Sequence, residues 1–216
     1  MTGLRERKKQ RTRDALIRAA HELFVAKGYE ATTVDEVTDT VDVSQRTFFR
    51  YFTSKEDVAF ALQDLVEQRY LEAVRERPPG EAPIEVLRRT LDETWQSIGE
   101  TIHEIVPMQL HMRMWQVIET TPALVAVHLR RSVEMEEALV TEIARRQDLD
   151  PEKDPRPRVL VAAYSGVMRA AGRRWGCGQD TSMTAAQCFM ESYVDALGPA
   201  LTDEWASTPP RVTADG

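Results

Sequence analysis

The sequence predicts an all-α protein of about nine helices, with a small three-helix domain ahead of a larger helical one. Apolar residues recur with a period near 3.6 through most of the chain. No stretch of any length shows the alternation that is typical of strands, and no internal repeat occurs. Proline and glycine clusters divide the periodic segments into short pieces before residue 55 and long pieces after it.

The first predicted helix covers residues 13–27 and ends at Gly28, a common residue at a helix C-terminus. A short helix over 34–40 follows, because Thr33 and Glu36 have the spacing of a capping box. The chain should then turn at Asp42. Ser44 is a good N-cap for a third helix, from Gln45 to about residue 52. Two helices of this length joined by a three-residue turn have the size of a helix-turn-helix.

Ser54 is predicted to cap a fourth helix that runs to about Arg77, where "RPPGEAP" stops it. The remaining predicted helices are separated by prolines and by "GCGQD", and they span 84–106, 108–121, 123–147, 156–176 and 182–205. We expect residues 1–54 to form one domain, 55–206 a second, and 207–216 a disordered tail.

Charge is unevenly distributed along the chain. The 216 residues carry a formal net charge of −7, yet residues 1–13 alone sum to +5, which suggests an anionic partner at one end only. The 42% apolar content is sufficient for a packed core. Cys177 and Cys188 form no disulfide or metal motif and are expected to be ordinary thiols. No signal peptide or membrane span is predicted, so the expected location is the cytoplasm.

The third helix separates its side chains into two faces. At about 100° per residue, Phe48, Tyr51 and Phe52 fall on one face and should pack on the first helix. The opposite face carries Arg46, Phe49 and Arg50, with Gln45 at its edge. A small helical bundle with solvated charges is the simpler alternative. The cap spacing, the exposed Phe49 and the basic N-terminus favour a DNA reader.

In a DNA-reading helix, the N-terminal residues contact bases. Gln45 and Arg46 stand at that end, and both can form bidentate contacts with bases. The predicted phosphate contacts come from three side chains and from the basic arm, namely Thr33, Arg50, Lys55 and arm residues such as Arg5 and Lys8. The arm could also enter the minor groove.

Residues 15–58 resemble the DNA-binding domain of the TetR family of transcriptional regulators. The matching landmarks keep their order and spacing: Ala19-Ala20, Leu23-Phe24, Gly28-Tyr29, Thr32-Thr33-Val34, Val43-Ser44, Thr47 and Tyr51-Phe52-x-Ser-Lys-Glu. The resemblance implies an all-helical homodimer, usually a repressor, that a small ligand releases from DNA. It also implies DNA contacts by Thr33, Ser44, Gln45, Arg46, Thr47, Phe49 and Lys55.

Two positions depart from the family pattern. Val41-Asp42 replaces the usual small residue and glycine of the turn, although Asp tolerates unusual backbone angles. Phe49 replaces a tyrosine whose hydroxyl meets a phosphate, so this contact becomes an apolar one or is lost. "SQRTFFRYF" and the basic lead resemble an actinobacterial branch that includes sensors of acyl-CoA-like ligands.

The second half contains two candidate features. Ala162, Gly166 and Ala170 are spaced by four, and the resemblance implies that the last two helices form the dimer interface; packing within one subunit is the alternative. Large side chains that suit an apolar ligand, or a plain core, are Trp95, Met108, His111, Met112, Trp115, Tyr164, Met168 and Trp175. Candidates for an acidic ligand group, more simply solvated, are Arg113, Arg130, Arg131, Arg173 and Arg174.

The predicted function is a dimeric regulator, most simply a repressor, that a small and largely apolar ligand releases from a palindromic operator. No cofactor or metal is expected, because the histidines are too scattered for a metal site. One alternative is a DNA-binding architectural protein without a ligand. A remote one is an enzyme for small apolar substrates, for which the sequence offers no nucleophile, metal or phosphate-loop motif.

Overall fold

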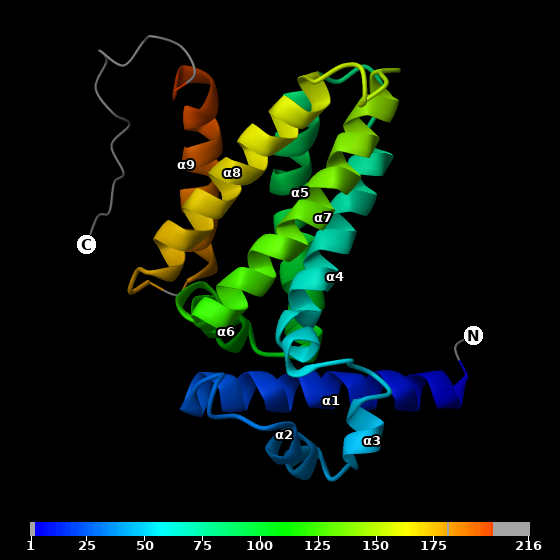
Figure 1. Ribbon diagram of the computed structural model, residues 1–216, viewed down its shortest axis with the longest axis vertical. Coiled ribbons are helices and arrows are strands. Elements are labelled where there is room, and N and C mark those ends of the chain that lie inside the picture. The colour runs from blue at the N-terminus through cyan, green and yellow to red at the C-terminus, as the bar shows by residue number, and fades with distance from the viewer. Residues whose placement is uncertain (1–2, 181, 201–216) are drawn as a thin grey trace.

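The computed structural model describes residues 3–180 and 182–200, and this part of the chain is all-helical (Figure 1). Its helices are α1 (Leu4–Lys27), α2 (Val34–Val41), α3 (Gln45–Phe48), α4 (Lys55–Glu76), α5 (Pro83–Ile105), α6 (Met108–Thr120), α7 (Pro122–Arg146), α8 (Arg156–Gly176) and α9 (Met183–Ala200). The all-α prediction is confirmed. The tail predicted to be disordered, 207–216, lies outside the described residues.

Helix α1 separates the molecule into two layers (Figure 1). Helices α2 and α3 lie on one side of α1, and the long helices α4, α5 and α7 stand on the other. Arg18 of α1 fixes the junction, because its guanidinium donates to the Ile105 carbonyl at the end of α5 with N···O distances of 2.7 and 3.0 Å.

The predicted helix starts around the turn are confirmed. Thr33 and Glu36 form the reciprocal capping box, and the Ser44 and Ser54 hydroxyls accept from the amides of Thr47 and Asp57. Asp42 ends α2 in the left-handed region, at φ 54°. An aspartate tolerates this conformation because its short polar side chain can bond locally, so the turn forms without the usual glycine.

Two boundaries differ from the prediction. Helix α1 begins at Leu4 rather than at residue 13, so the expected basic arm is three turns of helix. Helix α3 ends at Phe48 rather than near residue 52, and the chain continues in tight turns. The predicted faces still hold: Phe48 and Phe52 are buried, Tyr51 packs against the same core, and Phe49 is 51% exposed.

The hydrophobic core that packs against α1 extends into α4, α5 and α6. Its buried residues include Leu16 and Phe24 of α1, Phe60 of α4, Ile102 of α5 and Met114 of α6. A second core joins α4, α5, α7 and α8 at the far end of the molecule. Helices α2 and α3 therefore pack on a core that is shared with the rest of the molecule, and α4, α5 and α6 contact α1.

Candidate functional site

The exposed surface of α3 presents the side chains predicted to read bases. Ser44, Gln45 and Arg46 are exposed, and Thr47 is half-buried. The Gln45 amide donates to Asp35 of α2, so this side chain is held in place. Among the described residues no hydrogen bond or ion pair is recorded for Arg46, which leaves its five N–H groups available to a partner.

Phe49 and Arg50 flank this surface. The Phe49 ring packs edge-on against Phe48, with centroids 5.3 Å apart, so the exposed ring has a fixed direction. The Arg50 guanidinium lies over the Tyr51 ring, 5.0 Å from its centroid, and Nη2 donates to the Tyr51 hydroxyl at 3.3 Å.

Lys55 is placed differently from the expected free phosphate contact. Its ammonium donates to the carbonyls of Tyr29 and Thr32 at 2.9 and 3.0 Å and lies 4.1 Å from the centroid of the Tyr29 ring. Two of its three N–H groups are used within the protein, and one remains. Lys55 therefore holds the end of α1 on the start of α4.

Thr33 and Glu36 are held by local bonds. The capping box occupies the Thr33 hydroxyl, and Lys27 pairs with Glu36. Hydrogen bonds from Lys27, and then from Thr33, lower the pKa of Glu36 to about 2. The start of α2 is thus held rigidly, although the Thr33 hydroxyl is already used in the capping box.

The first turns of α1 form an exposed basic helix. Arg5, Lys8 and their neighbours from residue 3 to residue 11 are exposed, and Figure 1 shows this end of α1 extending past α3 and the base of α4. The charges predicted for a flexible arm are therefore carried on a rigid element.

A cavity of about 250 Å³ lies between the upright helices, and all eight predicted pocket residues line it. They come from α5 (Trp95), α6 (Met108, His111, Met112, Trp115) and α8 (Tyr164, Met168, Trp175). Helix α4 contributes Gln63, Val66, Glu67 and Tyr70 to the same wall. The apolar and thioether lining is the surface that an apolar ligand requires.

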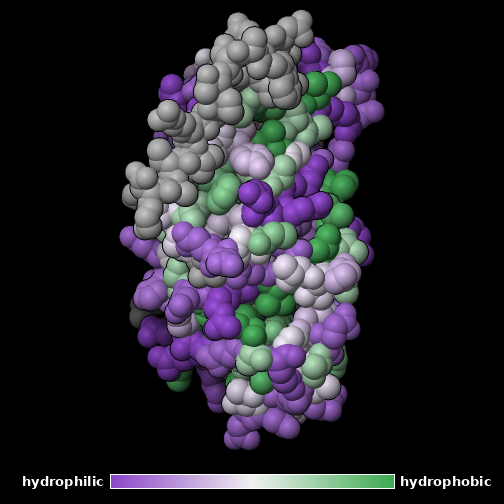
Figure 2. Space-filling model, turned by 90° about the vertical axis from the view of Figure 1, so that its left-hand side faces the viewer, coloured by the Kyte–Doolittle hydropathy of each residue, from purple (hydrophilic) through white to green (hydrophobic). Residues whose placement is uncertain are grey.

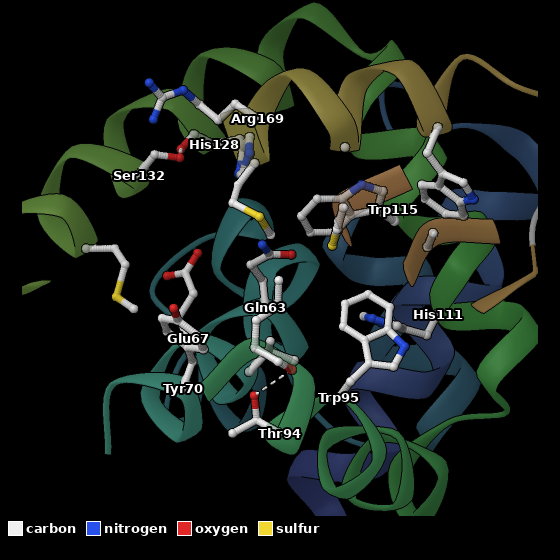
Figure 3. Close-up of a pocket in the computed structure, with 18 of the residues that line it drawn as sticks. Gln63, Glu67, Tyr70, Thr94, Trp95, His111, Trp115, His128, Ser132 and Arg169 are labelled. Carbon is white, nitrogen blue, oxygen red and sulfur yellow. Dashed lines mark hydrogen bonds between the residues drawn. The ribbon is translucent and has the colours of Figure 1, made fainter. Parts of the chain in front are cut away.

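The two ends of the cavity differ in chemistry (Figure 3). Trp95, Trp115 and His111 gather at one end, and Glu67, Ser132 and Arg169 at the other. Burial lowers the pKa of His111 to about 4. Burial, and then the charge of Asp64, raise the pKa of Glu67 to about 7. At neutral pH His111 is therefore uncharged, and Glu67 is close to its titration midpoint.

Several polar residues of this wall were not predicted: Gln63, Glu67, Glu119, His128, Ser132 and Arg169. The arginines predicted as candidates for an acidic ligand group do not line the cavity. Arg131, for example, pairs with Asp57 and Asp64 of α4. Arg169 does line the cavity, but it pairs with Glu136. The missed residues are polar side chains from four helices, α4, α6, α7 and α8, and they form no sequence motif.

The predicted dimer residues lie on the outside of α8. Ala162 and Ala170 are exposed and Gly166 is half-buried, with Val159 on the same side at 65% exposed. Figure 2 looks onto the side of the molecule that carries α9 and shows apolar patches among polar groups. This face offers close approach to a partner helix.

No helix within the described residues is long and apolar enough to span a bilayer. The same part of the chain contains no cluster of three or more side chains that could hold a metal ion.

Comparison with known proteins identifies both halves of the chain. The family model described as "Bacterial regulatory proteins, tetR family" matches residues 16–62, and the "MftR C-terminal domain" model matches 82–202. TcmR of Streptomyces glaucescens, an HTH-type transcriptional regulator, is 42% identical over 203 residues, which are 94% of this chain and 90% of TcmR. MftR of Mycobacterium tuberculosis, a putative mycofactocin biosynthesis transcriptional regulator, is 25% identical over 193 residues. These residues are 84% of this chain and 87% of MftR.

Among solved structures, NalD of Pseudomonas aeruginosa, described as the secondary repressor of the MexAB-OprM multidrug efflux pump, has a TM-score of 0.53 at 16% identity. The match covers 92% of this chain and all of NalD, and it shows a common fold. Because the family models and relatives are transcriptional regulators, this chain is a regulator and not an enzyme. The chain belongs to the TetR family of bacterial DNA-binding transcriptional regulators.

Proposed function

We propose that this regulator is a homodimeric repressor that leaves a palindromic operator when a small, largely apolar ligand enters the cavity. Residues 1–54 form the DNA-binding domain, residues 55–206 bind the ligand and form the dimer, and the protein acts in the cytoplasm. Repression is supported by NalD, a repressor that has the same fold. Dimerisation is supported by the small residues exposed on α8.

The observation that carries the proposal is the position of α4. Its middle lines the cavity through Gln63, Val66, Glu67 and Tyr70, and its first residue, Lys55, is bonded to the backbone after α1. A ligand in the cavity therefore contacts the same helix that holds the DNA-binding helices. Ligand shifts the equilibrium only if it binds one position of α4 better than another.

A set of contacts joins the cavity to the start of α4. The His128 ring, in the cavity wall, is stacked on Phe60 with centroids 6.3 Å apart. Arg131 lies 5.0 Å from the centroid of the Phe60 ring and pairs with Asp57, which in turn accepts from the Thr53 amide at 3.0 Å. Movement of His128 can thus reach the residues that precede α4.

A second connection runs through α1. Arg18 binds the Ile105 carbonyl two residues before Pro107, and α6 begins at Met108 of the cavity wall. A displacement of α6 by ligand would act on α1, and so on α3. In a dimer, tilting these elements changes the separation of the two α3 helices, which must match half-sites one helical turn or a multiple of a turn apart.

The experiment is selection of bound fragments from the genomic DNA of the source organism at two salt concentrations. We expect an inverted repeat, with affinity that falls steeply as salt rises. The same selection repeated after denaturing and refolding the protein removes any ligand that was purified with it. If no inverted repeat is enriched under either treatment, the operator proposal is wrong.

A further inference from the structure

One corner of the cavity is polar and lies where α6, α7 and α8 meet. Glu119 of α6 and His128 of α7 both line it, and the distance between Glu119 Oε1 and His128 Nε2 is 3.9 Å. Trp115 belongs to the same corner: its ring is 5.5 Å from the His128 ring, and Figure 3 shows the two side chains along one edge of the cavity.

The tight packing of α8 fixes the position of Glu119. A Cβ atom placed on Gly176 would lie 2.9 Å from both Cβ and Cγ of Glu119, so only glycine allows the helices to approach this closely. At Gly172 a Cβ atom would lie 3.8 Å from Trp115 Nε1 and 3.9 Å from Glu119 Oε1, which places these two polar atoms near one point. The carboxylate is held by its neighbours and has a fixed direction.

The polar groups of this corner lack partners within the described part of the chain. The Glu119 side chain is 5% exposed, and no hydrogen bond to its carboxylate is recorded there. Trp115 Nε1 and His128 Nδ1 are buried without a partner as well. The tyrosine hydroxyls elsewhere in the wall are satisfied: Tyr70 donates to the Leu87 carbonyl at 2.9 Å. A buried carboxylate without a donor is costly, so this corner is complementary to a polar group from outside the protein.

The distance between Glu119 Oε1 and His128 Nε2 indicates which ligand group fits between them. One oxygen can lie about 2.8 Å from each of two atoms that are 3.9 Å apart, which is a normal hydrogen-bond length. A hydroxyl placed there donates its proton to Glu119 and accepts from the His128 imidazole. An ether or ketone oxygen has no proton to give to the carboxylate.

Charge around the corner disfavours an ion. The wall carries the carboxyls of Glu67 and Glu119, and its one arginine, Arg169, is paired with Glu136. An anionic ligand, such as the acyl-CoA class suggested by the sequence, therefore meets no unpaired guanidinium in the described wall. Burial, and then the charges of Arg169 and Arg173, lower the pKa of His128, and a cation in this corner would meet the same two charges.

We propose that the effector of this cavity is an uncharged apolar molecule that carries a hydroxyl group, seated between the Glu119 carboxylate and the His128 imidazole. This inference rests on the proposed ligand-binding role of the cavity and names the chemical class of the ligand. Aromatic and thioether side chains contact the apolar body, and the corner at Glu119 recognises the hydroxyl.

The test is equilibrium dialysis of the full-length protein against three probes of nearly equal size: naphthalene, 2-naphthol and 2-methoxynaphthalene. A hydrogen bond to a charged group corresponds to about ten-fold or more in affinity. We therefore expect 2-naphthol to bind at least about ten-fold more tightly than the other two. Methoxynaphthalene should resemble naphthalene, because its oxygen cannot donate.

Variants at Glu119 test the assignment. Glu119→Met keeps an unbranched side chain beside Gly176 and should make the three probes bind equally. Glu119→Gln keeps the shape, removes the charge and should reduce the preference for naphthol. Glu142→Gln is the matched control, because Glu142 is also a buried carboxylate but pairs with Arg145 outside the cavity. It should keep the full preference.

Three results would overturn the inference. The first is equal binding of the three probes to the unchanged protein, and the second is a naphthol preference that survives in Glu119→Met. The third is tighter binding of a fourth, cationic probe, 1-naphthylmethylamine, than of 2-naphthol, which would indicate a cationic ligand. Naphthalene binding without a gain for naphthol leaves the proposed ligand-released regulator intact. A naphthol preference with no effect of any probe on operator binding supports the inference and contradicts the proposed release.

Discussion

Arg131 of α7 donates to Asp57 near the start of α4, with an Nη2···Oδ1 distance of 2.9 Å, and its other terminal nitrogen pairs with Asp64 about two turns further along. One guanidinium thus joins two carboxylates of α4 to the helix that carries His128 of the cavity wall. All three side chains are partly buried, so water screens this contact less than it screens a surface ion pair.

Replacing Arg131 by glutamine should lower the free energy of unfolding by about 1–3 kcal/mol, because two partly buried carboxylates lose their cation. Thermal or urea unfolding measures the change. The control is Arg158→Gln, since Arg158 pairs with Glu137 and Glu152 on the exposed surface and should cost no more than about 0.5 kcal/mol. Equal losses of unfolding free energy in the two variants would show that the Arg131 contacts stabilise the protein no more than an exposed ion pair does.

The sequence predicts the turn and its caps well because they depend on local chemistry. Thr33, Ser44 and Ser54 each bond an amide three residues ahead, so spacing alone identifies them. The end of α3 was missed for a related reason. Beyond Phe48 the chain closes through bonds from the amides of Arg50 and Tyr51 to residues three positions back, and such turns keep Phe52 on the buried side as an α-helix would. Side-chain periodicity does not distinguish the two.

The start of α1 was missed because amphipathic periodicity requires an apolar stripe. Residues 5–11 are charged and polar and form helix through propensity, since Arg, Lys, Glu and Gln are good helix formers. In the cavity the large side chains were identified by type and spacing. Glu119 and His128 were not, because a lone polar residue on a helix is normally solvent-facing, and only helix packing turns these two inward.

Arg46→Ala should relax the preference for one base in the operator and weaken specific binding by about 1–3 kcal/mol. The side chain is exposed at the N-terminal end of α3, where a helix in the major groove reads bases. Selection of bound DNA sequences with each protein measures the effect. An identical motif for the variant and the unchanged protein would show that Arg46 does not read a base.

Phe49→Tyr should tighten binding to all DNA sequences, because the added hydroxyl gains a phosphate contact. The ring is half exposed and its direction is fixed by Phe48, so the hydroxyl would point away from the core. Binding to operator and to unrelated DNA is compared at one salt concentration. Unchanged affinity for both would mean that no phosphate lies within reach of position 49.

Phe52→Ala should destabilise the protein by about 3–5 kcal/mol, because a large core side chain is removed. Phe52 is 4% exposed, its ring is 5.5 Å from that of Phe48, and the Arg13 guanidinium covers it. Phe49→Ala is the matched control, as it removes the same ring from an exposed position. Melting curves that shift by the same amount would contradict the division of the aromatics into core and surface.

Glu67→Gln should stabilise the protein at pH 8 and have little effect at pH 4.5. Burial raises the pKa of Glu67 to about 7, against 4.5 for an ordinary glutamate, so between these values the folded protein holds a proton that the unfolded chain has released. Stability must therefore fall as pH rises through this window, by at most about 3 kcal/mol. Glutamine resembles the protonated form of Glu67 and cannot ionise, so the variant does not lose stability as the pH rises. Unfolding measured at both pH values checks this, and the paired Glu142→Gln should be destabilising instead. A Glu67→Gln gain that is as large at pH 4.5 as at pH 8 would show that packing, and not the buried charge, is responsible.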